Sequence, residues 1–504
     1  MTEIYDIAII GGGVNGAGIA RDAAGRGASV VLLEKGDLAS GTSSASTKLI
    51  HGGLRYLEHY EFSLVREALQ EREKLWAIAP HIIEPLRFVL PYDAGMRPKW
   101  MLRTGLFLYD HIGGRQSLPR SESISLPDHE AGAWLKTKYS SGFVYSDCRV
   151  DDARLVVLNA MDAASRGANI RHHCAVTGMT RQQSYWIVET ECGTFHARSV
   201  VNAAGPFALD IISMAGMSTH RHMRLVRGSH IVVPRLFDHA FAYIFQQPDG
   251  RILFAIPYQQ DYTLIGTTDQ DQTEKLDTIR TSGEEITYLC EGVNRYFQSR
   301  ITPDDVIWHY AGVRALVDDG SGRPEAATRG YRLDMHGTDD GGPVMLSVLG
   351  GKITTYRHLA ESAVTTLSPY CGALASPDWT AGQPLPGGDF PRDGREGLIA
   401  RFQEDYPFLP ASMARRLLCS YGTRCYQIMK QKRDLSDLGH HFGHDLYQSE
   451  VDYLCEHEWA RSAEDIVWRR SKLGLHMKSC QIRGLEEYMA GRSGEIPNRL
   501  RSQT

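Results

Sequence analysis

The first thirty-five residues constrain the fold more than any other stretch of the chain. Residues 4–10 form a short apolar run rich in β-branched side chains, which predicts a buried strand. The segment Gly11–Gly16 follows directly and fits the pattern G-x-G-x-x-G. Residues 17–27 are typical of a helix of small residues, and residues 29–33 predict a second strand that ends on Glu34. This order is that of a dinucleotide-binding βαβ unit.

Each part of this motif has a physical role in holding a dinucleotide. Gly11 allows the tight turn, Gly13 lets the backbone approach a pyrophosphate, and Gly16 lets helix and strand pack closely. The N-terminus of the predicted helix offers unpaired N–H groups to the phosphates, and Asn15 within the motif is expected to bind the cofactor. Glu34 can accept hydrogen bonds from the ribose hydroxyls of an adenosine, which argues against NADP. An ordinary glycine-rich turn is the alternative, but it has no use for Glu34.

A second nucleotide-like signal lies near residue 350 and favours a flavin over a nicotinamide. Residues 343–349 predict a buried strand, Gly350 and Gly351 follow, and a helix is predicted to run to about Leu367. The N-terminus of such a helix can stabilise negative charge on a reduced isoalloxazine ring. A nicotinamide enzyme has no need of this late return to the cofactor, so we expect FAD.

Composition excludes several classes of function. The chain has 504 residues, enough for two or three domains, and its net charge of −5 gives no sign of nucleic-acid binding. Nine scattered cysteines without a C-x-x-C suit a reducing compartment. No signal peptide precedes the first strand, and no apolar stretch is long enough to span a bilayer. We expect no metal site, because the histidines and aspartate at 440, 441, 444 and 445 lack consistent ligand spacing.

The tract from residue 36 to residue 53 is rich in Gly, Ser and Thr. Small hydroxyl side chains and free backbone donors suit a loop wrapped round a phosphate and a ring system. A flexible linker is the alternative, but residues 48–51 interrupt the polar run. Arg55 and Tyr56 follow a glycine pair and can grip an anionic substrate over the cofactor. The alternative for these two residues is a solvated arginine and a packed tyrosine.

A mostly β insertion is predicted from residue 221 to residue 269, with a further strand at residues 308–316. His230 is a candidate acid or base on this insertion, and a packed core histidine is the alternative. Arg314 and Arg329 are candidate anion contacts, and a surface salt bridge is the alternative for each.

Residues 97–109 are the most interfacial segment, because they combine basic, aromatic and bulky aliphatic side chains. A helix of this kind can lie on an anionic membrane surface, and a core helix with a basic outer face is the alternative. Residues 146–155 are expected to begin a helix capped by aspartates.

Several motifs together resemble those of the FAD-dependent, aerobic respiratory glycerol-3-phosphate dehydrogenases. They are GGGVNGAGIARDAAGRG, SSASTKLIHGGLRYLEHYEF, YSDCRVDDARL, GSHIVVP, IGTTD, GVRAL and LGGKITTYR, and the match extends through DLGHHFGHDLY and EHEWARSAEDIVWRR. The resemblance covers nearly the whole chain. This chain has Ala315 where the family pattern usually has Pro.

The resemblance implies an α/β fold in which a Rossmann-like FAD domain of the glutathione-reductase type carries a mixed β substrate cap and a helical C-terminal domain. We expect the FAD domain in residues 1–76, 146–215 and 340–370. We expect the cap in residues 77–145 and 216–339, a linker in residues 371–395, and the helical domain in residues 396–504.

The resemblance also implies an activity and its partners. These are oxidation of sn-glycerol 3-phosphate to dihydroxyacetone phosphate, transfer of electrons to ubiquinone, and peripheral attachment to the cytoplasmic face of the inner membrane. It favours the membrane role for residues 97–109 and leaves a homodimer open. The alternatives are an oxygen-reducing glycerophosphate or amino-acid oxidase on the same fold, and a flavin-binding scaffold without turnover.

Roles for single residues carry over by motif. Arg55, Arg314, Arg329 and Lys352 become cationic substrate contacts. His51, Tyr56 and His230 line the site. We expect a hydride to pass from C2 of the substrate to flavin N5 and the hydroxyl proton to pass to His230, assisted by Arg314. Besides the first glycine motif and Glu34, the residues expected to bind FAD are Thr42, Ser43, Ser44, Lys48, Leu49, Val176, Gly205, Gly351, Lys352 and Thr354.

Overall fold

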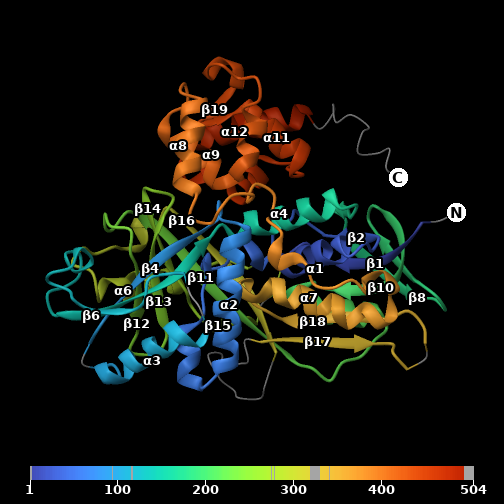
Figure 1. Ribbon diagram of the computed structural model, residues 1–504, viewed down its shortest axis with the longest axis horizontal. Helices are drawn as coiled ribbons and strands as arrows, with labels where there is room; N and C mark the ends of the chain where they lie inside the picture. Colours follow the sequence, from blue (N-terminus) through green and yellow to red (C-terminus); the bar gives the residue numbers. More distant parts are fainter. Residues whose placement is uncertain are drawn as a thin grey trace. The chain divides into compact units, whose positions relative to one another are not determined.

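The computed structural model describes residues 3–93, 95–114, 117–273, 275–276, 279–317, 330–339 and 341–492 (Figure 1). Arg329, a predicted substrate contact, lies outside the described residues. The chain divides into two units. The first contains Met1–Ile78 and Ile83–Gln383, and the second contains Ala79–Ile82 and Pro384–Thr504.

One sheet of the first unit carries the predicted dinucleotide motif. Strand β1 pairs in parallel with β2 and with β10, and β10 pairs in parallel with β18. The strand order across this sheet is β17 (Tyr331–His336), β18 (Met345–Gly350), β10 (Gly193–Asn202), β1 (Ile4–Ile10), β2 (Val30–Leu33) and β7 (Asn169–Arg171). An antiparallel hairpin of β8 (Val176–Arg181) and β9 (Trp186–Thr190) continues from β10. The parallel centre explains the continuous apolar runs of β1 and β2.

Three helices pack together beside this sheet: α1 (Val14–Gly25), α4 (Asp152–Ser165) and α7 (Tyr356–Leu367). Gly18 on α1 faces the Tyr356 ring so closely that a Cβ would lie 2.8 Å from it. Arg21 Nε donates to Asp162 across the α1–α4 contact at 2.6 Å. The predicted strand–helix–strand unit and the α/β fold class are therefore confirmed.

The helix expected to begin within residues 146–155, with aspartate caps, begins at Asp152. Residues up to Val150 belong to strand β6, and the Asp151 side chain accepts a hydrogen bond from the N–H of Arg154. Asp151 is thus the N-cap of α4. The apolar residues before it continue the strand because they pair with β4 across a sheet.

A second sheet of the first unit forms the predicted β insertion. Its strands are β15 (Gln270–Asp271), β11 (Met223–Pro234), β14 (Tyr262–Gly266), β13 (Ile252–Tyr258), β12 (Ala242–Gln246), β4 (Ile83–Pro91), β6 (Ser141–Val150) and β3 (Leu49–Ile50), in that order, with β16 (Trp308–Val317) paired to β11 and β5 (Glu122–Ser125) paired to β6. Helix α6 (Gly283–Asn294) is capped by Ser282 and Glu285 and packs on this sheet. Helices α2 (Phe62–Ile78) and α3 (Lys99–Ile112) connect the early strands.

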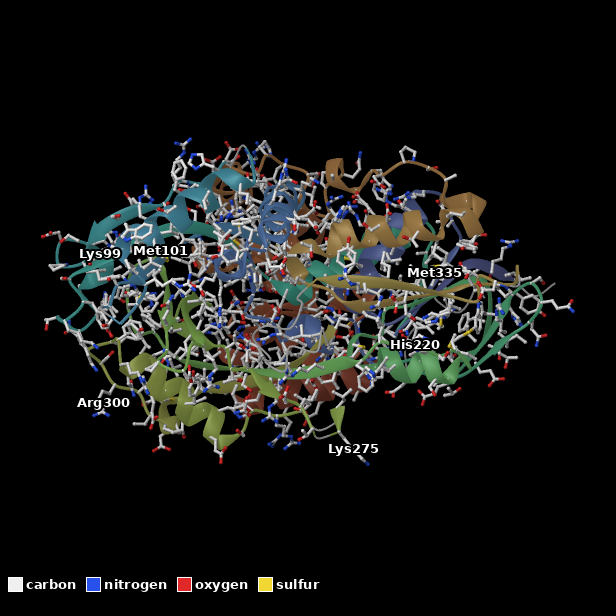
Figure 2. All side chains as sticks on the ribbon, turned by 90° about the horizontal axis from the view of Figure 1, so that it is seen from below. Lys99, Met101, His220, Lys275, Arg300 and Met335 are labelled. Atoms are coloured by element: carbon white, nitrogen blue, oxygen red, sulfur yellow. The ribbon has the colours of Figure 1, made fainter. Side chains whose placement is uncertain are left out.

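Aromatic rings dominate the core of this second sheet. Tyr243 and Phe245 on β12 contact Phe297 edge-on, with ring centroids 5.2 and 5.4 Å apart. Such pairs stabilise a core beyond the area that they bury. In Figure 2, Lys99, Met101 and Arg300 lie at the end of the first unit formed by this sheet, and His220 and Met335 lie toward the end formed by the parallel sheet.

Some boundaries in the structure differ from the expected domain limits. Strand β17 pairs with β18 in the parallel sheet, although residues 331–336 were expected in the cap. Residues up to Gln383 belong to the first unit, although the linker was expected from residue 371. Trp379 Nε1 donates to the carbonyl of Asp22 at 3.2 Å, and Thr380 Oγ1 donates to Glu361 at 2.6 Å. These polar contacts hold in place a segment whose composition had predicted a linker.

The second unit is mostly helical. Its elements are α8 (Arg395–Asp405), α9 (Ala411–Tyr421), α10 (Cys425–Ile428), β19 (His441–Gly443), β20 (Leu446–Tyr447), α11 (Gln448–His457), a π-helical segment (Asp465–Arg470) and α12 (Ser479–Arg492). Arg416 and Tyr421 on α9 both donate to the Glu450 carboxylate on α11. No helix among the described residues has both the length and the apolarity to cross a membrane.

Candidate active site

The N-terminus of α1 is built for close approach of a backbone. Gly11 has φ +113°, and a Cβ there would lie 2.5 Å from the carbonyl oxygen of Ala203. A Cβ at Gly16 would collide with the carbonyl oxygen of Gly11. Ala203 itself donates its N–H to Ile10 at 2.9 Å, so the end of β10 lies beside the glycine loop.

Glu34 lies where an adenosine ribose is expected. Its two carboxylate oxygens accept from the N–H groups of Gly12, at 2.6 Å, and Gly36, at 2.8 Å. Burial raises the pKa of Glu34 above its ordinary value, although these two hydrogen bonds oppose the rise. A carboxylate has about four acceptor positions, so Glu34 can still receive ribose hydroxyls.

The second glycine pair meets the first motif at Asn15. The side-chain amide of Asn15 donates to the carbonyl of Gly350 at 3.3 Å. A Cβ at Gly351 would lie 3.1 Å from the amide nitrogen of Asn15. Asn15 Oδ1 is buried without a hydrogen-bond partner in the described part of the chain. Segments 335 residues apart in sequence therefore converge at the start of α1.

The loop of residues 42–48 connects the cofactor motif with the second sheet. Ser43 Oγ accepts from the N–H of Val14, the first residue of α1, at 2.9 Å. Thr42 Oγ1 donates to the carbonyl of Val313 on β16 at 2.7 Å. Thr47 Oγ1 lies 2.9 Å from Nε2 of His230 on β11. One loop thus contacts the helix N-terminus and both strands that carry the predicted catalytic residues.

A buried ion pair holds this loop in shape. Lys48 Nζ bonds both carboxylate oxygens of Asp152, at 2.8 and 2.9 Å, and the carbonyl of Ser44 at 2.9 Å. Asp152 also accepts from the Ser46 hydroxyl at 2.7 Å. Lys48 and Asp152 are almost completely buried. Lys48 therefore acts on the loop backbone through Asp152 in addition to its predicted place near the cofactor.

His230, on strand β11, is almost completely buried. Its ring stacks on Tyr310, with centroids 4.9 Å apart and planes 12° apart. Burial, helped by the charges of Arg314 and Lys48, lowers the pKa of His230 well below 6.5. Its Nδ1 has no hydrogen-bond partner among the described residues. The imidazole is therefore neutral at pH 7, and one ring nitrogen can take a proton.

Arg314 lies on the strand next to His230, since β16 pairs antiparallel with β11. Its Nη1 forms an ion pair with Asp269, and its Nη2 donates to Thr267 Oγ1 at 2.7 Å. A Cβ at Gly228 would collide with the guanidinium, so this glycine makes room for it. Asp269 and Thr267 fix the direction of a cation that retains further donors for an anion.

The loop of residues 51–56 meets the second glycine loop. The N–H of His51 donates to Thr354 Oγ1 at 3.2 Å. Lys352 Nζ lies 3.9 Å from the centre of the Tyr56 ring, a cation–π contact. Arg55 is half-buried on the 3-10 helix Leu54–His59. Four of the predicted substrate contacts, His51, Arg55, Tyr56 and Lys352, therefore come from two loops in contact.

The family model described as FAD dependent oxidoreductase matches residues 6–357. The chain belongs to the FAD-dependent oxidoreductase family. A second model, described as the C-terminal domain of alpha-glycerophosphate oxidase, matches residues 379–486. The predicted FAD cofactor is confirmed by this membership.

Named relatives place this oxidoreductase more narrowly. A glycerol-3-phosphate dehydrogenase of Pseudomonas aeruginosa is 48% identical over 99% of this chain and 97% of its own. A D-erythritol 1-phosphate dehydrogenase of Brucella abortus is 47% identical over 96% of this chain and 98% of its own. A solved Bacillus halodurans glycerol-3-phosphate dehydrogenase, complexed with FAD, superposes with a TM-score of 0.76 at 26% identity, over 99% of this chain and 93% of that one. The resemblance to glycerol-3-phosphate dehydrogenases is confirmed.

The residues of this oxidoreductase fit FAD. Gly205 has φ +58°, and a Cβ there would meet open space, so the turn after β10 leaves room beside the glycine loop. Asn15 Oδ1, which has no hydrogen-bond partner among the described residues, and the Glu34 carboxylate, which accepts from Gly12, supply polar groups for a dinucleotide. Val176 lies two residues after Cys174, whose N–H donates to the carbonyl of Glu34 at 2.8 Å. Leu49 is buried on β3, which pairs with β6.

Four residues with a part in the site were missed as single residues. Thr47 bonds His230, Asp152 pairs with Lys48, and Thr267 and Asp269 hold Arg314. The sequence did contain a signal for these residues, because each of them lies inside one of the motifs that resemble the glycerol-3-phosphate dehydrogenases. Their roles depend on which strands become neighbours, and that information is absent from a local pattern.

Proposed function

We propose that this oxidoreductase oxidises sn-glycerol 3-phosphate to dihydroxyacetone phosphate and passes the electrons to a ubiquinone-type acceptor. The observation that carries the proposal is the loop of residues 42–48. It bonds the N-terminus of α1 through Ser43 and bonds His230 through Thr47. An acid–base group therefore lies one loop away from the cofactor motif, and relatives named glycerol-3-phosphate dehydrogenase, at 46–48% identity, support the substrate.

The phosphate of the substrate is held by cations. Arg314, oriented by Asp269, comes from strand β16, and Lys352, beside Tyr56, comes from the second glycine loop. Arg55 adds a third cation on the 3-10 helix Leu54–His59. Arginine offers paired donors that match a phosphate, and lysine adds a point charge. We include Arg329 among the contacts on the resemblance alone.

His230 takes the proton of the C2 hydroxyl. Its neutral imidazole has an Nδ1 without a hydrogen-bond partner in the described part of the chain, while Thr47 bonds Nε2 and fixes the ring. The stacked Tyr310 keeps the ring plane in place. Arg314 assists by holding the phosphate, and with it the substrate, close to His230. FAD, when bound, accepts the hydride, and the chain supplies orientation and electrostatics.

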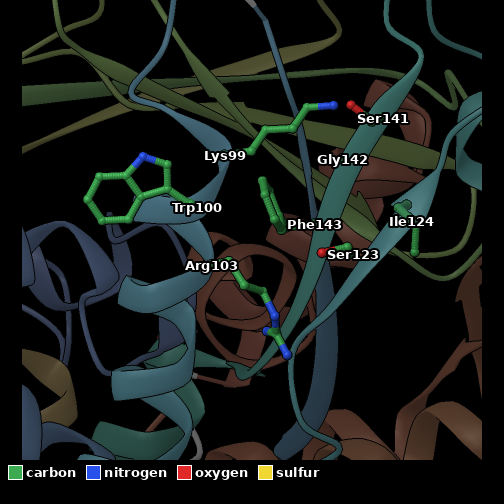
Figure 3. A pocket seen from close by; sticks show the side chains of 8 residues that line it. All are labelled: Lys99, Trp100, Arg103, Ser123, Ile124, Ser141, Gly142 and Phe143. Carbon is green, nitrogen blue, oxygen red and sulfur yellow. The ribbon is translucent and has the colours of Figure 1, made fainter.

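Attachment to the cytoplasmic face of the inner membrane is proposed through α3. Trp100 is 67% exposed and Phe107 is 54% exposed, and Lys99 and Arg103 are exposed beside them. A cavity of about 250 Å³ opens next to Trp100 (Figure 3). Its lining comes from α3, β5 and β6 and consists of Lys99, Trp100, Arg103, Ser123, Ile124, Ser141, Gly142 and Phe143. Apolar and cationic side chains on one helix suit an anionic lipid surface.

A second polyol phosphate is a specific competitor as substrate. The Brucella abortus relative named D-erythritol 1-phosphate dehydrogenase is almost as similar as the glycerol-3-phosphate dehydrogenase. Extra hydroxyl groups are best discriminated by hydrogen bonds made in the transition state.

The test is a comparison of kcat/KM for the two phosphates with a ubiquinone analogue as acceptor. We expect sn-glycerol 3-phosphate to be preferred by at least about ten-fold. Preference for D-erythritol 1-phosphate would reassign the substrate. Peroxide formed in step with substrate oxidation would instead show an oxygen-reducing oxidase. A flavin that neither phosphate reduces would leave a flavin-binding scaffold.

A further inference from the structure

A buried hydrogen-bond network joins α3 to the loop that carries His51 and Tyr56. Tyr109, near the C-terminal end of α3, is 1% exposed. Its hydroxyl oxygen accepts the N–H of Gly52 at 2.8 Å and donates to the Asp147 carboxylate, 2.8 Å from each oxygen. Asp147 also accepts from Gly52, at 3.2 Å, and from Arg72 Nη1, at 2.7 Å.

The protonation states of the network agree with these roles. Burial and the charge of Asp147 raise the pKa of Tyr109 well above 10. Burial lowers the pKa of Arg72, but the charge and hydrogen bond of Asp147 together with the neighbouring Tyr109 and Cys148 outweigh burial and raise it above its ordinary value. Tyr109 is therefore a neutral phenol. Its O–H donates a hydrogen bond to Asp147, and a lone pair of its oxygen accepts the N–H of Gly52.

The loop backbone rests directly on this hydroxyl. A Cβ at Gly52 would lie 2.6 Å from Tyr109 Oη and would also collide with Leu69. Gly53 has φ +75°, and its carbonyl accepts from the N–H of Tyr56 at 2.9 Å. The distance between the Gly52 backbone and the Tyr109 hydroxyl therefore sets the position of His51, which precedes Gly52, and that of Tyr56, which follows it.

We propose that Tyr109 is a positioning residue for the substrate, because its hydroxyl fixes the backbone of residues 51–56 where His51, Arg55 and Tyr56 meet the anionic group. The inference rests on the proposed function for the identity of the substrate and adds a residue of α3 to the site. Through the hydroxyl of Tyr109, helix α3 therefore supports the backbone of residues 51–56.

The test is Y109F, which removes one hydroxyl and leaves the ring in place. Gly52 then keeps only its longer bond to Asp147. We expect KM for sn-glycerol 3-phosphate to rise by about five- to ten-fold, with kcat within about two-fold and FAD content unchanged. Hydrogen exchange of the backbone amides in residues 51–56 should quicken by about the same factor.

The matched control is Y145F. Tyr145 is a buried tyrosine on β6 whose ring meets that of Tyr109 edge-on, with centroids 5.9 Å apart. Loss of its hydroxyl should leave KM and the exchange of residues 51–56 as in the unaltered protein. A Y109F protein that matches Y145F in KM would overturn the proposal, even if exchange of the loop had quickened.

The exchange measurement separates this proposal from the proposed function. If the unaltered protein does not oxidise sn-glycerol 3-phosphate, the substrate assignment fails. The exchange of residues 51–56 in Y109F against Y145F still decides whether Tyr109 holds the loop. Equal exchange in the two variants would then refute the positioning role.

Discussion

The cofactor end and the substrate end of this site are built by different means. At the cofactor end, backbone atoms and one carboxylate make most of the contacts, and although Asn15 bonds Gly350 across 335 residues, the contact of Gly12 with Glu34 spans only 22. At the substrate end, charged and polar side chains are brought together over long separations, as with Thr47 and His230, which are 183 residues apart. The first region is specified by steric limits, and the second by which strands become neighbours.

This difference predicts different responses to substitution. A side chain added where backbones touch has no room, so a change at the cofactor end acts as an all-or-none loss. A side chain removed at the substrate end leaves the backbone intact, so its effect is graded and falls on one kinetic constant. The predictions below run from the largest expected effect to the smallest.

The largest effect is expected at Gly16. A valine there would collide with the carbonyl oxygen of Gly11 and separate α1 from the glycine turn. We expect G16V to lose FAD, measured as the visible absorbance of the purified protein. The matched control is G397A, since a Cβ at Gly397, inside helix α8, meets open space and alanine favours a helix. Retention of FAD by G16V would break the comparison at its cofactor end.

His230 tests the substrate end. We expect H230A to bind FAD normally and to lose about 10²- to 10⁴-fold in kcat, because a general base contributes a factor of that size. Stopped-flow reduction of the flavin at saturating substrate measures it. Turnover equal to that of the unaltered enzyme would remove His230 from the role of base.

Asp269 tests how far charge orients Arg314. In D269N the guanidinium loses its ion pair while the shape of the side chain is kept. We expect KM to change by roughly ten-fold and kcat to change little, because a phosphate contact binds ground state and transition state alike. Steady-state kinetics with sn-glycerol 3-phosphate gives both constants. A fall in kcat at constant KM would instead assign Arg314 to the chemical step.

The smallest effect is expected in the pH profile. The pKa of His230 in the enzyme without substrate lies well below 6.5. The midpoint of the acid limb of the kcat/KM profile should therefore also lie well below pH 6.5. Arg314 contributes to that lowering, so R314M should raise the pKa and move the limb to higher pH by about one unit or less. A limb that moves to lower pH would contradict the sign of this interaction.

The sequence made much of the cofactor end predictable. The strand, glycines, helix and acid of residues 4–34 needed only local sterics, and the structure reproduces them. Strand β6, residues 141–150, was not predicted because it depends on pairing with β4, and pairing is not a local property. For the same reason Thr47, Asp269 and Tyr109 could not be assigned roles before their neighbours were known.

The measurement that tests the central claim most directly is anaerobic. The purified protein is given sn-glycerol 3-phosphate while its visible spectrum is recorded. The account predicts that the oxidised-flavin band is lost and that a ubiquinone analogue restores it. A yellow protein that keeps its band under excess substrate would contradict the account, because the cofactor end would then be correct and the substrate end wrong.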